Sequence, residues 1–188
     1  MKKFGITGSL ASGKSTASKI LSANKGPLFS ADLVVKNLYK KKNFKKVISK
    51  NFYIKNQSKL KSTLKKKILK DKNNFKKLEK IIHPIVRKEM LRFMKKYKKK
   101  KFIFFEIPLL IESRLMKNFD VIFFIKAKKS LRLKRFKAKG GDKKFFNILN
   151  SKQLNDNKKS RYCDHVIVNE KNLIILKKNL LDIFKRYE

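Results

Sequence analysis

The sequence predicts a three-layer α/β fold in which a five-stranded parallel sheet lies between helices. The first observation is a set of five short apolar runs, at Phe4 to Thr7, Leu28 to Ser30, Phe102 to Glu106, Val121 to Lys126 and His165 to Val168. Longer stretches with helical spacing separate these runs, and parallel neighbours need such crossover connections. The third observation is a glycine-rich motif directly after the first run.

The segments between the runs divide the chain further. Apolar residues recur at helical spacing in Ser15 to Ala23, Leu78 to Tyr97, Leu131 to Ala138 and Leu173 to Tyr187. The stretch of about 33–101 is far longer than one crossover needs and predicts several helices without a strand. We expect one domain over 1–188, with a core of 1–36 and 101–188, a helical insertion at about 37–100 and a lid at about 132–150. Gly140 and Gly141 predict a mobile turn in that lid.

The composition is that of a folded and strongly basic protein. Hydrophobic residues make up 41% of the 188 residues, which excludes general disorder despite 35% charged residues. The net charge of +40 raises the question of a nucleic-acid partner, but 46 of the 53 basic residues are lysine and only 7 are arginine. Lysine is spread over the whole chain. We therefore interpret the charge as compositional drift and expect no nucleic-acid partner.

The sequence lacks the features of disulfide-bonded secreted proteins and of membrane-spanning proteins. Cys163 is the only cysteine, which excludes an intrachain disulfide, and we expect it to be a packing residue. No apolar run approaches the length of a membrane span, and glycines interrupt the apolar start after Lys2 and Lys3. We expect a cytoplasmic monomer without a membrane partner.

Gly8 to Ser15 fits the phosphate-loop pattern G-x-x-x-x-G-K-[ST] between a predicted strand and a predicted helix. The two glycines let backbone N–H groups turn toward a phosphate at a helix N-terminus. Lys14 adds positive charge beside the β- and γ-phosphates, and the Ser15 hydroxyl is placed to bind Mg²⁺. The prediction is a three-layer P-loop NTPase fold that binds a nucleoside triphosphate with magnesium, with ATPase, GTPase and kinase all open.

Asp32 follows the second predicted strand. The carboxyl ends of neighbouring parallel strands share one edge, so Asp32 is expected near the γ-phosphate. A carboxylate there can accept the proton of an attacking hydroxyl or hold a water of magnesium. Capping of a helix that begins at Leu33 explains the residue equally well.

The chain resembles the dephospho-CoA kinase family, which phosphorylates the ribose 3′-hydroxyl of dephospho-CoA with ATP in the last step of coenzyme A synthesis. The resemblance runs from Phe4 to about Asn169. It rests on Thr7-Gly8 through Lys14-Ser15-Thr16, Ala31-Asp32, Leu78-Glu79 through Ile82-His83-Pro84-Ile85-Val86-Arg87, and Pro108-Leu109-Leu110-Ile111-Glu112-Ser113, followed by Arg135, Gln153, Asp164-His165-Val166-Ile167 and Asn169.

The resemblance implies a set of site residues. Catalysis falls to Asp32 as the base, with Lys14 and Arg135, and Ser15 holds the metal. ATP binding is implied for Gly8, Ser9, Leu10, Ala11, Ser12, Gly13, Lys14, Ser15, Thr16, Lys139 and Asn169. Acceptor binding is implied for Asp32, His83, Pro84, Leu109 and Leu110. The implied cofactors are ATP and Mg²⁺, and the implied substrate is dephospho-CoA.

Several of these positions also have plainer explanations. His83 before a proline is typical of a helix end or a packing residue. Glu112 fits the cap of a following helix. Arg135 and Lys139 lie four residues apart on one helical face and could stabilise the transferring phosphoryl group, although a solvated basic face explains Lys139 as well.

The chain departs from the family pattern at a few positions. Ser30-Ala31-Asp32 stands where the family has Asp-Ala-Asp, so one carboxylate is missing. Lys139 replaces a lid arginine, which keeps the charge and loses the bidentate geometry. The alternatives are another nucleotide or small-molecule P-loop kinase, or a nucleotide-gated nucleic-acid-binding protein.

Overall fold

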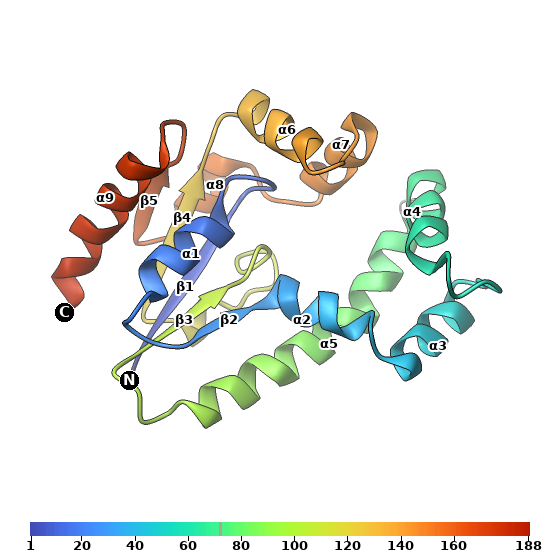
Figure 1. Cartoon of the computed structure of the whole chain (residues 1–188), viewed down its shortest axis with the longest axis horizontal. Coiled ribbons are helices and arrows are strands. Elements are labelled where there is room, and N and C mark those ends of the chain that lie inside the picture. The colour runs from blue at the N-terminus through green and yellow to red at the C-terminus, as the bar shows by residue number, and fades with distance from the viewer. Residues whose placement is uncertain (72) are drawn as a thin grey trace. The chain divides into compact units, whose positions relative to one another are not determined.

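The computed structural model describes residues 1–71 and 73–188. Its strands form one parallel sheet in the order β2-β3-β1-β4-β5 (Figure 1). The strands are β1 (Lys2–Gly8), β2 (Leu28–Ser30), β3 (Phe102–Glu106), β4 (Val121–Lys126) and β5 (His165–Val168). The helices are α1 (Lys14–Ser22), α2 (Ala31–Leu38), α3 (Lys42–Asn51), α4 (Leu60–Lys70), α5 (Asn73–Lys96), α6 (Lys129–Ala138), α7 (Lys143–Ser151), α8 (Asp156–Ser160) and α9 (Leu173–Phe184), with short 3₁₀ turns η1 (Met116–Asn118) and η2 (Lys185–Tyr187).

All five strands coincide with the predicted apolar runs, and only β1 is longer. It begins at Lys2 instead of Phe4, because backbone pairing with β3 continues where the side chains are already polar. Lys3 pairs with Ile103 in this ladder, and its N–H donates to the Asp120 carboxylate over 2.7 Å. The apolar pattern marks where a strand is buried, whereas the backbone ladder marks where it ends.

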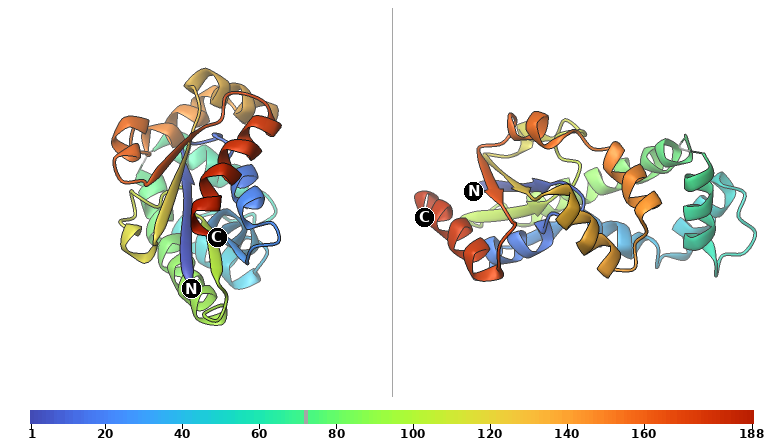
Figure 2. Two further views of the ribbon diagram at one scale, coloured as in Figure 1. Left: turned by 90° about the vertical axis from the view of Figure 1, so that its left-hand side faces the viewer. Right: turned by 90° about the horizontal axis from the view of Figure 1, so that it is seen from above.

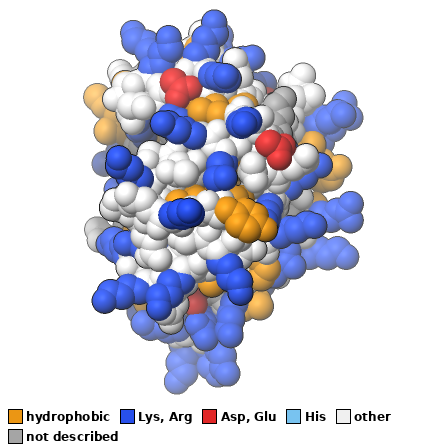
Figure 3. Space-filling view, turned by 90° about the vertical axis from the view of Figure 1, so that its right-hand side faces the viewer, with side chains coloured by type: hydrophobic (Ala, Val, Ile, Leu, Met, Phe, Trp, Pro, Cys, Tyr) orange, Lys and Arg blue, Asp and Glu red, His pale blue; other side chains and the backbone are white. Residues whose placement is uncertain are grey.

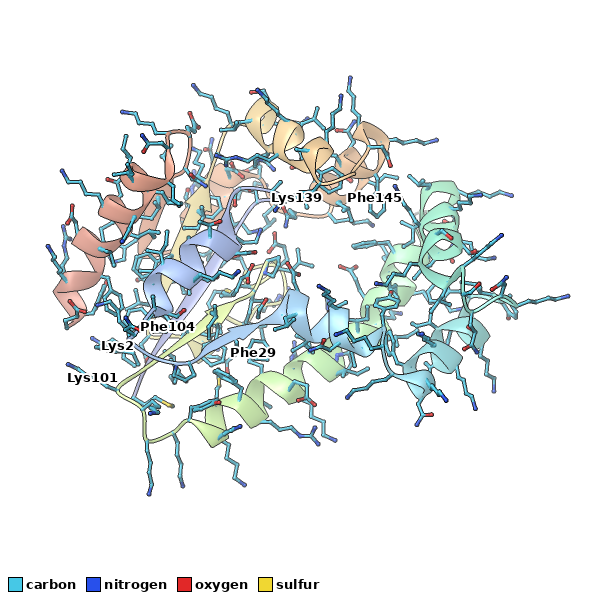
Figure 4. The ribbon with its side chains drawn as sticks, in the orientation of Figure 1. Lys2, Phe29, Lys101, Phe104, Lys139 and Phe145 are labelled. Atoms are coloured by element: carbon cyan, nitrogen blue, oxygen red, sulfur yellow. The ribbon has the colours of Figure 1, made fainter. Side chains whose placement is uncertain are left out.

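One face of the sheet packs against α1 and α9, which lie on the same side of the strands (Figure 2). Phe4 of β1 is fully buried and stacks on Phe104 of β3 with ring centroids 5.2 Å apart. Phe184 of α9 lies 5.1 Å from the Phe4 ring centroid and closes the layer. Figure 4 labels Phe104, and also Phe29 of the edge strand β2, whose ring instead packs on Phe105 at 5.7 Å between centroids on the other face of the sheet. Burial of these aromatic rings is the main force that holds the helices on the sheet.

The opposite face is covered by the chain after β3 and by α8, which contacts β4. Gly5 shows how closely that layer approaches: a Cβ on Gly5 would lie 2.8 Å from the Leu110 side chain and 3.1 Å from the Phe119 ring. The fold is therefore three-layered, as predicted. Within the described part of the chain, no helix combines the length and the apolar content that a membrane crossing requires.

The chain forms two compact units. The first comprises Met1–Ser30 and Met94–Glu188 and holds the whole sheet, and the second comprises Ala31–Phe93. Among its described residues, the second unit contains α2, α3, α4 and most of α5 and has no strand, as the sequence predicted. The limits of about 37–100 for a functional insertion stay a prediction.

The helix α5 runs unbroken through Pro84, although proline lacks the N–H of a helical hydrogen bond. The interpretation of His83 as a helix-end residue is therefore wrong, because α5 continues to Lys96. Ile82 and Met90 are buried on the inner face of this helix. Their packing supports the helix on both sides of the proline.

Candidate functional site

The phosphate loop (Gly8–Ser15) joins β1 to α1, and its two glycines are required by close approach. A Cβ on Gly8 would lie 2.5 Å from the Ile125 carbonyl oxygen and 2.7 Å from Ser12 Oγ. Gly13 has φ +101°, and a Cβ there would lie 2.1 Å from Asn169 Nδ2. No other residue type fits either position without moving the loop.

The loop has the features of an anion site. The backbone N–H groups of Ala11, Gly13 and Ser15 make no hydrogen bond within residues 1–71 and 73–188. The buried Ser12 hydroxyl also has no partner among those residues. Lys14 is 7% exposed, and its Nζ donates to the Ser9 carbonyl over 3.0 Å. Donors, a lysine and the N-terminus of α1 together fit a phosphate chain.

Side chains from other elements hold the loop carbonyls. Asn169 Nδ2 donates to the Ser12 carbonyl over 2.8 Å, and Arg135 Nη1 reaches the same oxygen at 3.4 Å. Arg132 Nη1 donates to the Leu10 carbonyl over 3.3 Å. Arg135, implied for catalysis, and Asn169, implied for ATP binding, therefore both contact the loop, and Arg132 joins them.

Arg132 is a buried cation in this arrangement, with 5% exposure. Its Nε donates to the Ala127 carbonyl over 3.1 Å, and its Nη1 donates to Asn150 Oδ1 over 2.8 Å. Burial lowers the pKa of Arg132, and the nearby Asp156 carboxylate partly offsets that effect. Because an arginine stays protonated in proteins, Arg132 places a permanent positive charge beneath the loop.

A buried carboxylate lies beside the first turn of α1. Glu106 ends β3 and is 3% exposed. Its Oε1 accepts a hydrogen bond from Ser15 Oγ, and its Oε2 accepts one from Ser30 Oγ over 2.9 Å. Hydroxyl and carboxylate oxygens are the donors that Mg²⁺ prefers, so Ser15 and Glu106 together fit such an ion. Within the described residues there is no cluster of three or more His, Cys, Asp or Glu side chains.

The structure places the other implied residues as follows. Thr16 is exposed in the first turn of α1, and Lys139 is exposed at the end of α6, where Figure 4 labels it near Phe145 of α7. Leu109 is half-buried after β3, and Leu110 is fully buried against Gly5. Leu110 is therefore a packing residue in this structure.

Asp32 belongs to the unit Ala31–Phe93. The helix α2 begins at Ala31, so Asp32 lies inside its first turn and is not the cap of a helix beginning at Leu33, as one interpretation had it. An acidic side chain in a first turn is stabilised by the helix dipole. The chain enters α2 directly from Ser30, whose hydroxyl contacts Glu106.

His83 and Pro84 line an open groove of about 760 Å³ on α5. Its other lining residues are mostly basic: Lys76, Glu79, Lys80, Arg87, Lys88 and Leu91. Burial and then the Arg87 charge lower the pKa of His83. The pKa is lowered although the Glu79 carboxylate lies 3.8 Å from His83 Nε2. His83 is therefore neutral at pH 7 and the cations set the charge of the groove.

Of two further side chains, Glu112 differs from the plain expectation and Cys163 agrees with it. Glu112 does not cap a helix, because its Oε1 accepts from Leu154 N over 3.0 Å and pairs with Lys159 Nζ at 2.9 Å. Burial raises the pKa of the Cys163 thiol to about 12. The thiol is therefore protonated at neutral pH and unreactive, which fits the expected packing role.

Sequence reasoning missed several residues that shape the site. Glu106 had a visible signal, since it is a lone carboxylate at the end of an otherwise apolar strand. Arg132 had a weaker signal, because it is one of only 7 arginines in a lysine-rich chain. Gln153 matched the family pattern without an assigned role, and Asp156 had no signal; both reach the phosphate loop across more than 140 residues of sequence.

The positive charge shows no single focus on the face seen in Figure 3. Lysine and arginine side chains are scattered over it, with neutral and hydrophobic atoms between them. A nucleic-acid site is typically a continuous basic stripe with aromatic side chains. The expectation that nucleic acid is not a partner stays a prediction.

The family model for dephospho-CoA kinase matches residues 3–174. The chain belongs to the dephospho-CoA kinase family. A dephospho-CoA kinase of Bartonella quintana (strain Toulouse) is 33% identical over 178 residues, covering 92% of this chain and 91% of that one. A dephospho-CoA kinase of Fusobacterium nucleatum subsp. nucleatum is 31% identical over 193 residues, covering 98% and 94% of the two chains.

Solved structures agree with this family. The dephospho-CoA kinase from Campylobacter jejuni superimposes with a TM-score of 0.68 at 25% identity, covering 99% of this chain and 97% of that chain. A shikimate kinase from Acinetobacter baumannii, with a TM-score of 0.61 at 12% identity and coverage of 99% and 94%, shows the same fold. These comparisons confirm the predicted P-loop fold and the predicted dephospho-CoA kinase activity, which is the last step of coenzyme A synthesis. The family implies ATP as the phosphoryl donor.

Proposed function

We propose that this chain transfers the γ-phosphoryl group of ATP to the ribose 3′-hydroxyl of dephospho-CoA, giving coenzyme A and ADP. The observation that carries the proposal is the phosphate loop, in which Lys14 and Ser15 open α1 beside the buried Glu106. We further propose that the protein acts as a monomer in the cytoplasm.

The phosphate loop and Thr16 bind the triphosphate in this proposal. The N–H groups of Ala11, Gly13 and Ser15 donate to phosphate oxygens, and Lys14 balances the charge that moves onto the leaving β-phosphate. Asn169 keeps the Ser12 carbonyl turned away from the anion by donating to it. Because the loop already has the conformation that binds the triphosphate, little free energy is lost in rearranging it during the transfer.

Ser15 and Glu106 are the residues that we propose to hold Mg²⁺, Ser15 directly and Glu106 through a water. A magnesium ion bound there would neutralise charge on the β- and γ-phosphates. The hydroxyl of Ser15 is already oriented by Glu106. The two residues therefore present oxygen donors on one side of the loop.

Asp32 is the proposed catalytic base. The 3′-hydroxyl attacks the γ-phosphorus in line, its proton passes to the Asp32 carboxylate, and the bond to the β-phosphate oxygen breaks. Asp32 follows by two residues Ser30, which pairs with Glu106 at the ends of β2 and β3. Its first-turn position in α2 places the carboxylate at the positive end of the helix dipole.

The proposed lid residues are Arg135 and Lys139 of the 132–150 segment. Arg135 already contacts the Ser12 carbonyl at 3.4 Å, so a small movement brings its guanidinium onto a phosphate. Lys139 is exposed and free to turn toward the transferring group when the lid closes. Positive charge at that point stabilises the transition state.

Acceptor binding is assigned to His83 and Pro84 in the groove on α5. The cations of that groove fit the phosphates of dephospho-CoA, and the neutral His83 ring adds a hydrogen-bonding and stacking surface. Leu109, half-buried after β3, is a further proposed contact, and Leu110 anchors the chain that carries it.

The test offers ATP and Mg²⁺ with dephospho-CoA, and separately with nucleoside monophosphates, and identifies the phosphorylated product. We expect 3′-phosphorylated dephospho-CoA. Asp32→Asn should nearly abolish turnover while ATP still binds, and Asp182→Asn, an exposed carboxylate of α9, is the matched control. Phosphorylation of a monophosphate with none of dephospho-CoA would refute the proposed acceptor.

A further inference from the structure

Residues 153–159 contact the phosphate loop from the far end of the chain. Gln153 Oε1 accepts a hydrogen bond from the Leu10 N–H over 2.7 Å. Asp156 Oδ1 accepts one from the Ser9 hydroxyl. Both side chains face the loop next to the N–H groups that could bind a phosphate. Neither accepts from the N–H groups of Ala11 or Gly13, which make no hydrogen bond within the described residues.

The loop needs such support because one of its residues is strained. Ala11 has φ +58°, in the left-handed region that residues with a Cβ rarely adopt. A conformation of this kind persists only when its surroundings enforce it. The residue before it, Leu10, is held at both ends of its backbone, its N–H by Gln153 and its carbonyl by Arg132.

The 153–159 segment is itself anchored by a buried ion pair. Lys159 is completely buried, and its Nζ lies 2.9 Å from Glu112 Oε1 and donates to the Pro108 carbonyl over 3.1 Å. The same Glu112 oxygen accepts from the Leu154 N–H, directly after Gln153. Glu112, in the chain that follows β3, thus holds both ends of the segment, accepting from the Leu154 N–H at one end and pairing with the Lys159 ammonium at the other.

The buried ion pair is also connected by hydrogen bonds to the residue before the phosphate loop. The Pro108 carbonyl that Lys159 contacts accepts a second hydrogen bond from Thr7 Oγ1 over 3.1 Å, and Thr7 directly precedes Gly8. A buried ion pair is weak evidence for stability, since two apolar residues would often serve as well. The hydrogen bonds of the Lys159–Glu112 pair are directional, so they hold the segment in one position, which apolar contacts would not do as well.

We propose that Gln153 and Lys159 are positioning residues for triphosphate binding. Gln153 enforces the strained turn at Ala11, and Lys159, paired with Glu112, keeps Gln153 in place. Neither residue contacts ATP. This inference rests on the proposed binding of ATP to the phosphate loop.

The decisive variant is Gln153→Ala, with Gln57→Ala as the matched control. Gln57 is the other glutamine of the chain and is exposed. Isothermal titration with a non-hydrolysable ATP analogue gives Kd, and steady-state kinetics at saturating ATP give KM for dephospho-CoA. We expect Gln153→Ala to raise Kd by about tenfold or more, since the partly buried Leu10 N–H loses its acceptor and the turn at Ala11 is no longer enforced, with KM for dephospho-CoA unchanged and the Tm lowered only by the loss of one hydrogen bond.

Two outcomes of this experiment would overturn the role of Gln153. The first is an unchanged Kd. The second is a parallel rise of Kd and of KM for dephospho-CoA with a lower Tm, which marks a general structural loss. The proposed function fails differently, by wild-type protein that binds the analogue and does not phosphorylate dephospho-CoA.

Lys159 is tested with its partner, so that no charge is left buried alone. In Lys159→Met with Glu112→Gln, the Leu154 N–H keeps an acceptor while the link to Pro108 is lost. We expect Kd for the analogue to stay about tenfold above wild type even where the Tm recovers relative to Lys159→Met alone. A wild-type Kd in the double variant would show that Lys159 only balances the charge of Glu112.

Discussion

Ser30 donates a hydrogen bond to Glu106 where β2 and β3 end side by side, with Ser30 Oγ 2.9 Å from Glu106 Oε2. The family pattern has an aspartate at position 30, and a carboxylate there would face Glu106 at close range. The serine instead gives the buried Glu106 a neutral donor, while Ser15 supplies the other one. The serine that replaces the family aspartate thus donates to the Glu106 carboxylate instead of repelling it.

Restoring the family residue at position 30 is expected to harm this chain. In Ser30→Asp two carboxylates meet at hydrogen-bond distance, and like charges at that separation repel. We expect a lower Tm at pH 7.5 than for Ser30→Ala, which loses only one hydrogen bond, or about 1 kcal/mol. The difference between the variants should shrink at pH 5, where one carboxylate of a close pair takes up a proton. Thermal unfolding at both pH values measures this, and equal Tm values for the two variants at pH 7.5 would contradict it.

Replacement of the buried carboxylate tests the proposed metal site. Glu106→Gln keeps the shape of the side chain but removes its charge and one of its two acceptor oxygens, so the amide can accept from only one of the Ser15 and Ser30 hydroxyls. We expect the Mg²⁺ concentration for half-maximal activity to rise by about tenfold, as for the loss of an outer-shell carboxylate. The exposed Glu89→Gln on α5 is the control. An unchanged magnesium requirement in Glu106→Gln would show that Glu106 does not help to hold the metal.

The two left-handed glycines of the chain give a matched pair of variants. In Gly13→Ala the new Cβ lies 2.1 Å from Asn169 Nδ2, whereas at Gly140 nothing lies within 4 Å. Both changes strain the backbone, since φ is +101° and +79°. We expect Gly13→Ala to raise Kd for an ATP analogue by at least about tenfold and Gly140→Ala to leave it nearly unchanged. Titration calorimetry on both variants measures this, and similar losses would mean that backbone strain, and not contact with Asn169, governs the loop.

The sequence predicted the sheet well, for a physical reason. A strand buried on both faces, such as β4, needs an uninterrupted apolar run, and that signal is local. Helix limits were less certain, because the start of α2 at Ala31 and the passage of α5 through Pro84 depend on packing that no local pattern records.

The site was predictable only in part. The phosphate loop has a fixed spacing, because its backbone must wrap one phosphate, and Gly8 and Gly13 are required at their positions. The residues that support it have no such spacing. Gln153 and Lys159 reach the loop and its anchor through the tertiary fold. The family pattern includes Gln153 but does not show what it contacts, and the ammonium of Lys159 is indistinguishable in sequence from those of surface lysines.

The two histidines of the chain predict how stability depends on pH. Burial and then Arg87 lower the pKa of His83 below its ordinary value of 6.5. Burial also lowers the pKa of His165, an effect that Asp164 opposes and Arg186 reinforces. The unfolded chain therefore binds protons more readily than the folded chain once the pH falls below about 6.5.

Stability is accordingly expected to fall as the pH drops from about 6.5 through the lowered pKa values, and to be nearly constant from pH 7 to 8. Thermal unfolding between pH 5 and 8 measures this window, which lies above the usual titration of carboxylates. A variant with His83→Gln and His165→Phe should flatten the curve, since phenylalanine keeps a ring against Phe123. If the variant loses as much stability as the wild type between pH 6.5 and 5, the loss comes from other groups, and the histidines are not its cause.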